Sequence, residues 1–295
     1  MTASANGENP LEPMCERRSH VWSGSVSNLR GKRILLAGYG LPAEYGLAVL
    51  FSLGANPSDV LLFTEPPDAR NKGLVAAAEL RNITFSTSPA ITEIARLMAR
   101  KFSPDILLCL HYRRRIPRDL LDLPRFSPVN LHPSLLPRYR GVYAVPWTII
   151  QGERKTGFSF HYMEETFDTG RLLLQGELDI ASDETAFSLF HRQITAALPM
   201  LPGVLDMVLH RAPGRAQEGK ASYFERRLPY DGRIDPSWPD DLVDRFIRAM
   251  YFPPFEPALL ERDGHTFKIR TMSDYHAAVQ ARARGRASYT DSLKL

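Results

Sequence analysis

The chain has 295 residues, of which 44% are apolar, and a formal net charge of +4 at pH 7. A chain of this length can bury a full hydrophobic core, which excludes the class of small domains stapled by disulfides. It contains only Cys15 and Cys109, no run of 18 apolar residues and no apolar segment in its first 30 residues. We therefore expect a cytoplasmic protein without a secretory signal or a membrane span.

The first part of the chain predicts alternating strands and helices. Residues 1–28 are polar and aperiodic, and we expect a disordered leader there. Apolar runs typical of buried parallel strands lie at 33–37, 59–65, 83–87, 105–112 and 128–132, and segments of helical spacing lie between them at 42–55, 71–82 and 90–102. This alternation predicts an α/β fold with a Rossmann-like, mostly parallel sheet and flanking helices.

Two more strands are expected in the middle of the chain. They lie at 157–163 and 172–180, on either side of a loop. A long helix is expected to follow over 183–210, with Asp183 or Ser182 as its N-cap. These elements complete an expected catalytic domain at 29–210.

The last part of the chain has a different composition, richer in Gly, Pro and charged residues. Asp263-Gly264 lies between two short apolar runs and predicts a β-hairpin. We expect a smaller, mixed, β-containing C-terminal subdomain at 211–275. The arginine-rich end, 276–295, is expected to be a basic disordered tail.

The stretch VNLHPSLLPRYRG, residues 129–141, places two polar side chains at the end of an expected strand. Asn130 and His132 are two residues apart and therefore point to the same side, at the edge of the sheet where ligands bind. An Asn amide and a His ring could together hold a substrate carbonyl and handle a proton. Taken alone, such a pair is more often a satisfied polar pair than a site. The Leu136-Pro137 bond that follows is a candidate for the cis form.

Two motifs together carry a resemblance to a known family. NLHPSLLPRYRG and the later TGFSFHYMEETFDTG resemble the 10-formyltetrahydrofolate-dependent formyltransferases, over about residues 32–205 and more loosely over 222–270. The resemblance implies N10-formyltetrahydrofolate as co-substrate. We expect no metal, because the sequence has neither an HExxH motif nor a Cys/His cluster.

The resemblance also implies a catalytic role for three residues. Asn130 and a protonated His132 would donate hydrogen bonds to the oxyanion that forms on the formyl group. Asp168 would orient His132, raise its pKa and take the proton of the acceptor directly or through water. His161, on the strand before the second motif's loop, is a further candidate for direct involvement.

The same resemblance suggests where the two substrates bind. The pterin is expected against mainly backbone groups of two loops, formed by Leu110, His111, Tyr112, Arg113, Arg114 and Ile116 and by Met163, Glu164, Glu165, Thr166 and Phe167. The acceptor is expected near Ser134, Arg140, Gly141 and Tyr143. After Gly141 the chain departs from the pattern of many members, since Pro146 is displaced by two residues; this leaves the acceptor in doubt.

The acceptor class rests on finer similarities. The segment LLCLHYRRRIP, the short C-terminal part and the segments YDGRIDPSW and FIRAMYFPPFEPALLERDGHTFKI most resemble nucleotide-sugar N-formyltransferases. We therefore expect a small, nucleotide-linked amino sugar as acceptor, no nucleic-acid partner and, by family analogy, a homodimer. The alternatives are formylation of hydroxyornithine or of initiator methionyl-tRNA, hydrolysis of formyltetrahydrofolate, and folate binding without catalysis.

Overall fold

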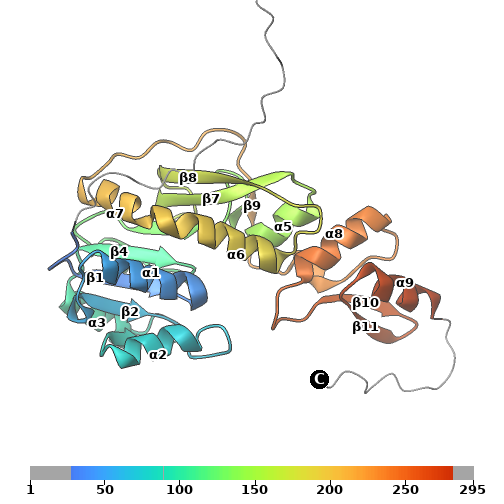
Figure 1. Cartoon of the computed structure of the whole chain (residues 1–295), viewed down its shortest axis with the longest axis horizontal. Helices are drawn as coiled ribbons and strands as arrows, with labels where there is room; N and C mark the ends of the chain where they lie inside the picture. The colour runs from blue at the N-terminus through green and yellow to red at the C-terminus, as the bar shows by residue number, and fades with distance from the viewer. Residues whose placement is uncertain (1–27, 89, 282–295) are drawn as a thin grey trace, which may run out of the picture.

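The computed structural model describes residues 28–88 and 90–281. Its centre is a seven-stranded sheet with the order β3-β2-β1-β4-β5-β7-β8 (Figure 1). Strands β3 to β5 of this order pair in parallel, and β7 and β8 are added by antiparallel pairing. The predicted mostly parallel sheet is therefore confirmed. Its strands are β1 (Ile34–Gly38), β2 (Val60–Phe63), β3 (Thr84–Ser86), β4 (Ile106–Leu110), β5 (Val129–His132), β7 (Lys155–Tyr162) and β8 (Leu172–Asp179).

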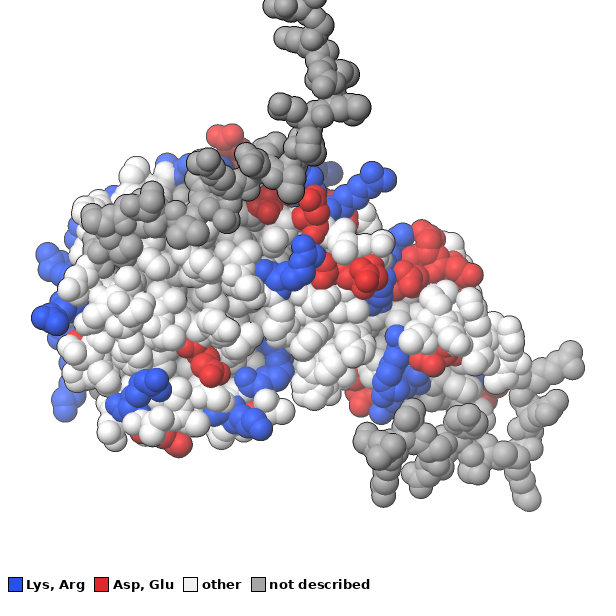
Figure 2. Space-filling view, in the orientation of Figure 1, with Lys and Arg blue, Asp and Glu red and all other residues white. Residues whose placement is uncertain are grey.

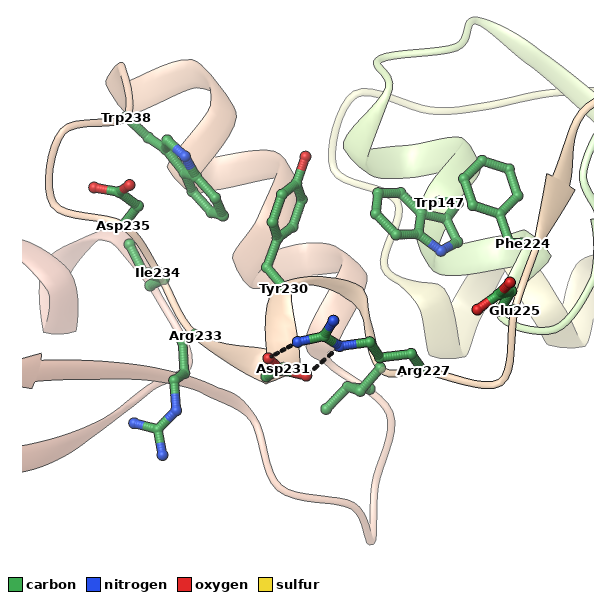
Figure 3. Close-up of a pocket in the computed structure, with 11 residues that line it drawn as sticks. Trp147, Phe224, Glu225, Arg227, Tyr230, Asp231, Arg233, Ile234, Asp235 and Trp238 are labelled. Carbon is green, nitrogen blue, oxygen red and sulfur yellow. Dashed lines mark hydrogen bonds and ion pairs between the residues drawn. The ribbon is translucent and has the colours of Figure 1, made fainter.

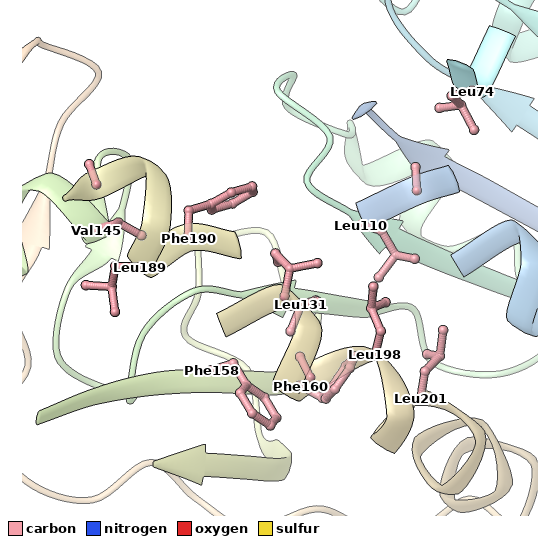
Figure 4. Packing of buried hydrophobic residues seen from close by; sticks show 14 of the residues in the cluster. Leu74, Leu110, Leu131, Val145, Phe158, Phe160, Leu189, Phe190, Leu198 and Leu201 are labelled. Atoms are coloured by element: carbon pink, nitrogen blue, oxygen red, sulfur yellow. The ribbon is translucent and has the colours of Figure 1, made fainter. Parts of the chain in front are cut away.

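Strand β1 shows why helices cover both faces of this sheet. All of its residues are buried, and alternate side chains point to opposite faces. Ile34 and Leu36 enter one core cluster, and Leu35 enters the other. The first cluster, part of which is drawn in Figure 4, packs against α1 (Gly40–Ser52), α2 (Lys72–Leu80), α6 (Ala186–Ala197) and α7 (Leu201–Leu209). The second packs against α3 (Glu93–Phe102) and α4 (Arg118–Leu121).

The expected long helix at 183–210 differs from the prediction in two respects. Its N-cap is Thr185, whose hydroxyl accepts a hydrogen bond from the Ser188 N–H at 3.1 Å, and not Asp183 or Ser182. A 3₁₀ turn, Leu198–Met200, separates α6 from α7. Pro199 and Pro202 each lie at the start of the element that contains them, because proline has no N–H to donate within a helix.

The chain beyond residue 211 first returns to the catalytic part. Strand β9 (Tyr223–Phe224) pairs in parallel with β6 (Arg140–Gly141). A 3₁₀ turn at Pro229–Gly232 then leads to α8 (Asp240–Met250), which packs against α5 (Ala144–Ile150). A further 3₁₀ turn, Pro57–Asp59, directly precedes β2 in the first part of the chain.

The final elements are a hairpin and a helix. Strands β10 (Ala258–Arg262) and β11 (His265–Ile269) pair antiparallel. Asp263 and Gly264 between them have φ values of 49° and 77°, so the predicted turn is present. Helix α9 covers Met272–Gln280, so the expected domain boundary after residue 275 falls inside a helix. The expected leader, apart from residue 28, and the expected tail beyond residue 281 lie outside the described residues.

None of the helices in the described ranges combines the length and the apolar character that a membrane span requires.

Candidate active site

The carboxyl end of β5 holds Asn130 and His132, and both side chains meet the carboxylate of Asp168 from the loop between β7 and β8. The Asn130 amide nitrogen lies 3.4 Å from Asp168 Oδ1. His132 Nδ1 lies 3.5 Å from Asp168 Oδ2. The structure thus brings together three groups that the sequence separates by up to 38 residues.

His161 is the fourth member of this group. It lies opposite Asn130 in the antiparallel pair of β5 and β7, and its Nε2 is 3.1 Å from the Asn130 amide nitrogen and 3.3 Å from Asp168 Oδ1. Its Nδ1 donates to the Tyr162 carbonyl at 2.7 Å, because a carbonyl oxygen can only accept. Nε2 faces both groups, and it can accept from the Asn130 amide when it has no proton or donate to Asp168 Oδ1 when it carries one.

The carboxylate of Asp168 is held in its ionised form. Burial by itself would raise the pKa of Asp168. The charge of His132, the hydrogen bond and charge of His161, and a hydrogen bond from the Gly141 N–H outweigh burial, and together they hold this pKa well below its usual range. The Gly141 N–H donates to Asp168 Oδ2 at 2.8 Å. Asp168 itself has a φ of 57°, a left-handed conformation that favours residues such as Gly, Asn and Asp.

His132 departs from the expected protonation state. Asp168 raises the pKa of His132 as expected, but burial lowers it by more, so the pKa lies below its ordinary value and the imidazole of the free protein is neutral at neutral pH. Its Nε2 donates to the Tyr139 carbonyl at 2.7 Å, which leaves Nδ1 without a proton and facing Asp168. A second proton on Nδ1 would find a carboxylate acceptor already in place.

The two loops expected to bind the pterin approach one another. Arg115 and Glu165 form an exposed ion pair at 3.8 Å between them. Tyr112 lies in the first loop, and burial raises its pKa to about 12. His111 has a φ of 62°, its ring lies 4.8 Å from that of Phe190, and burial lowers its pKa to about 3.

The side chains of the other expected pterin residues differ in accessibility. Leu110 and Ile116 are buried in the core, so only their backbone groups could reach a ligand. Glu65 forms ion pairs with Arg113 at 3.7 Å and with Arg114 at 3.1 Å. In the second loop Met163 is half-buried, whereas Glu164, Glu165, Thr166 and Phe167 are exposed.

The residues expected to contact the acceptor have different surroundings. Ser134 is fully buried, and its hydroxyl donates to the Arg138 carbonyl at 2.7 Å, which gives it a role in the turn in place of the expected substrate contact. The Leu136-Pro137 bond in this turn is cis. Gly141 binds Asp168, as described above, and Tyr143 is 39% exposed at the start of α5.

Gln217 completes the site and was not predicted from the sequence. Its side-chain N–H groups donate to the carbonyls of Asp168 and Gly170, both at 2.8 Å. Its Oε1 accepts from Arg140 Nε at 3.2 Å and from the terminal guanidinium nitrogen Nη2 at 2.7 Å. Gln217 therefore holds the backbone on both sides of the Asp168 loop and occupies the Arg140 side chain.

We expect Gln217→Glu to lower kcat by roughly tenfold or more, because a carboxylate cannot donate to either carbonyl and repels both. The matched variant Gln217→Ala also loses both donors but introduces no charge, so its loss should be smaller. Steady-state kinetics on both variants would check this, with the KM for the folate expected to change less than kcat. Equal kcat values in Gln217→Glu and the wild type would contradict the positioning role.

Two cavities are found elsewhere among the described residues, and neither is lined by Asn130, His132 or Asp168. The first, of about 620 Å³, lies between α5, β9 and the segment before α8 (Figure 3). Its walls carry the rings of Trp147, Phe224, Tyr230 and Trp238 and the ion pair of Arg227 with Asp231. The second, of about 570 Å³, includes Met163 and Glu164 of the second pterin loop.

No group of three or more His, Cys, Asp or Glu side chains within residues 28–88 and 90–281 is placed to hold a metal ion.

Comparison with known proteins identifies the family of this chain. A family model described as formyl transferase matches residues 55–205. The chain is 46% identical over 248 residues to GDP-perosamine N-formyltransferase of Brucella melitensis, covering 84% of this chain and 96% of that protein. It is 34% identical to methionyl-tRNA formyltransferase of Syntrophus aciditrophicus, covering 76% of this chain and 73% of that protein.

A solved structure shares the fold. The N-formyltransferase from Helicobacter canadensis, in complex with folinic acid and dTDP-3-aminofucose, superimposes with a TM-score of 0.67 at 18% identity, covering 81% of this chain and 86% of that one. The family match and the Brucella relative show that the chain belongs to the formyl transferase family.

Proposed function

We propose that this protein transfers the formyl group of N10-formyltetrahydrofolate to the primary amine of a nucleotide-linked amino sugar. The observation that supports it most is the meeting of Asn130, His132 and Asp168 at the carboxyl edge of the sheet. The 46% identity to a GDP-perosamine N-formyltransferase supports a GDP-linked sugar.

The proposed reaction needs an oxyanion donor and a proton carrier. The acceptor amine attacks the formyl carbon, a C–N bond forms, and the carbonyl oxygen becomes an oxyanion. The Asn130 amide donates to this oxyanion in place of its long 3.4 Å contact with Asp168. A donor in such a position typically lowers the barrier by about 2.7–4 kcal/mol.

His132 carries the proton in this proposal. Its Nδ1 takes the proton released by the attacking nitrogen, and the imidazolium then donates to both the Tyr139 carbonyl and Asp168. When the bond between the formyl carbon and N10 breaks, the same proton passes to N10. Asp168 stabilises the imidazolium and stays ionised, because its own pKa is held low.

The main alternative acceptor is initiator methionyl-tRNA, because the alignment with a methionyl-tRNA formyltransferase extends over 76% of this chain. A tRNA-binding enzyme needs basic surface for phosphate contacts. On the face of the described residues shown in Figure 2, basic and acidic side chains are interspersed, and no continuous basic patch is seen. This face therefore does not supply such a surface, and the higher identity to a nucleotide-sugar enzyme, 46% against 34%, favours the nucleotide-sugar acceptor.

A panel of acceptors tests the proposal. Purified protein with N10-formyltetrahydrofolate would be given GDP-perosamine, dTDP-3-aminofucose, hydroxyornithine and methionyl-tRNA, and the products would be analysed by mass spectrometry. We expect a gain of one carbonyl unit on a nucleotide sugar and none on the other two acceptors. Formylation of methionyl-tRNA alone would assign the alternative, and formate release without any formylated acceptor would indicate hydrolysis.

A further inference from the structure

The guanidinium group of Arg70 is surrounded by a cage of three aromatic rings, and no carboxylate in the described part of the chain forms an ion pair with it. Its central carbon is 5.3 Å from the ring centre of Tyr39, 4.7 Å from that of Phe252 and 5.2 Å from that of Phe255. Within the described residues no carboxylate comes within 4.0 Å of it, and its side chain donates no hydrogen bond. Its N–H groups are therefore available to a ligand.

The nearest acid is already engaged. Asp68 accepts from the Tyr39 hydroxyl at 2.6 Å and from the backbone N–H groups of Arg70 and Asn71, each at 2.9 Å. A second guanidinium, that of Arg113, lies 4.6 Å from the same Tyr39 ring. Arg113 is already paired with Glu65 at 3.7 Å, but the two cations that share this ring still repel each other, and an anion bound at Arg70 would lower this repulsion.

The cage lies at the edge of the sheet that holds the catalytic residues. Tyr39 follows β1, Arg70 follows β2, and Arg113 follows β4, which pairs with β5 beside Asn130. Ligands of open parallel sheets bind beyond these strand ends.

The far wall of the cage comes from the C-terminal part of the chain, between α8 and β10. Figure 1 shows the loop between β2 and α2 reaching toward these elements, and the contacts of Arg70 with Phe252 and Phe255 join the two parts. Phe255 is 54% exposed, and the neighbouring Tyr251 is 38% exposed. Exposed rings next to an unpaired guanidinium suit a ligand that carries both a planar base and phosphate groups.

We propose that the group formed by Tyr39, Arg70, Phe252 and Phe255, here called the Arg70 cluster, binds the nucleoside diphosphate of the acceptor, with the buried ring of Tyr39 supporting the Arg70 guanidinium. Arg70 contacts the diphosphate, and the two phenylalanine rings contact the base. This inference rests on the proposed function and deepens it, because it places acceptor selection in a surface shared by the sheet and the C-terminal part. The amine-bearing sugar then extends along the strand ends toward Asn130.

Calorimetric titration with GDP, GMP and guanosine tests the Arg70 cluster. Arg70→Met keeps most of the apolar stem and removes the charge, so it should weaken GDP binding by roughly tenfold or more and guanosine binding far less. Arg70→Lys keeps the charge but loses the forked guanidinium donors, so its GDP affinity should lie between those of the wild type and Arg70→Met. Phe255→Ala should weaken GDP and guanosine binding alike.

Arg81→Met is the matched control, because Arg81 also stacks on a ring, that of Phe51 at 5.6 Å, on an exposed helix end away from the site. It should bind GDP as the wild type does. Thermal unfolding and binding of a 5-formyl folate would show that every variant is folded. A purely structural role for Arg70 would lower the unfolding temperature of Arg70→Met without changing GDP affinity.

The outcomes separate this inference from the proposed function. GDP affinities within twofold of the wild type in both Arg70→Met and Arg70→Lys would overturn the Arg70 cluster and leave formyl transfer standing. A wild type that formylates an amine yet binds none of GDP, dTDP or UDP would overturn the cluster together with the nucleotide-linked acceptor. Arg70-dependent GDP binding without formyl transfer would support the cluster and contradict the proposed function.

Discussion

Replacing Asp168 by Asn is expected to lower kcat for formyl transfer by about 10³-fold, while a 5-formyl folate still binds with nearly the wild-type affinity. The reason is that, among residues 28–88 and 90–281, the Asp168 carboxylate at 3.5 Å is the partner of His132 Nδ1 that can stabilise a proton there. Asparagine has the same size and can still accept from the Gly141 N–H, so the loop should keep its conformation.

The pH profile gives this prediction a second readout. Asp168 stays ionised throughout the working range because its pKa is held low. The pKa of His132 is lowered below its ordinary 6.5, so wild-type kcat should be flat near neutral pH and fall only as His132 becomes protonated at lower pH. Loss of the negative charge in Asp168→Asn lowers the pKa of His132 further, so the acidic fall should move to lower pH.

Steady-state rates from about pH 5 to pH 9 would check both effects. A kcat in Asp168→Asn within tenfold of the wild type, with the acidic fall in the same place, would show that His132 and Asp168 do not act as a pair.

Replacing Gly141 by Ala is expected to destabilise the fold by about 2–4 kcal/mol and to lower kcat as well. Gly141 has a φ of +87°, and an added Cβ would lie 2.2 Å from the Phe224 carbonyl oxygen. The clash separates β6 from β9 and displaces the N–H that binds Asp168.

Gly264→Ala is the control for this change. Gly264 also has a positive φ, +77°, but an added Cβ there would meet nothing within 4 Å. The free energy of unfolding of Gly264→Ala should therefore fall by only about 1–2 kcal/mol, and its kcat should equal that of the wild type. Thermal unfolding combined with kinetics on both variants would check this. Equal losses of stability and of kcat in Gly141→Ala and Gly264→Ala would mean that backbone strain alone explains the effect.

Local features of the protein were readable from the sequence because their causes are local. The buried run at Ile34–Gly38 and the turn at Asp263-Gly264 depend on neighbouring residues only, and both are present. The two-residue spacing of Asn130 and His132 likewise placed both side chains on one side of a strand. The N-cap of α6 was missed because Ser182, Asp183 and Thr185 can all cap a helix, and only the hydrogen bond to Ser188 distinguishes them.

The positions and ionisation of the site residues were decided by the tertiary structure. Gln217 reaches Asp168 from 49 residues away, and Gly141 binds it through a backbone N–H that every residue except proline possesses, so no sequence pattern marks either contact. The pKa of His132 follows from its burial, which the surrounding elements create together and which overrides its acidic neighbour. The sequence alone determined which functional groups are available to the site, and the packing of distant segments determined their distances, charges and partners.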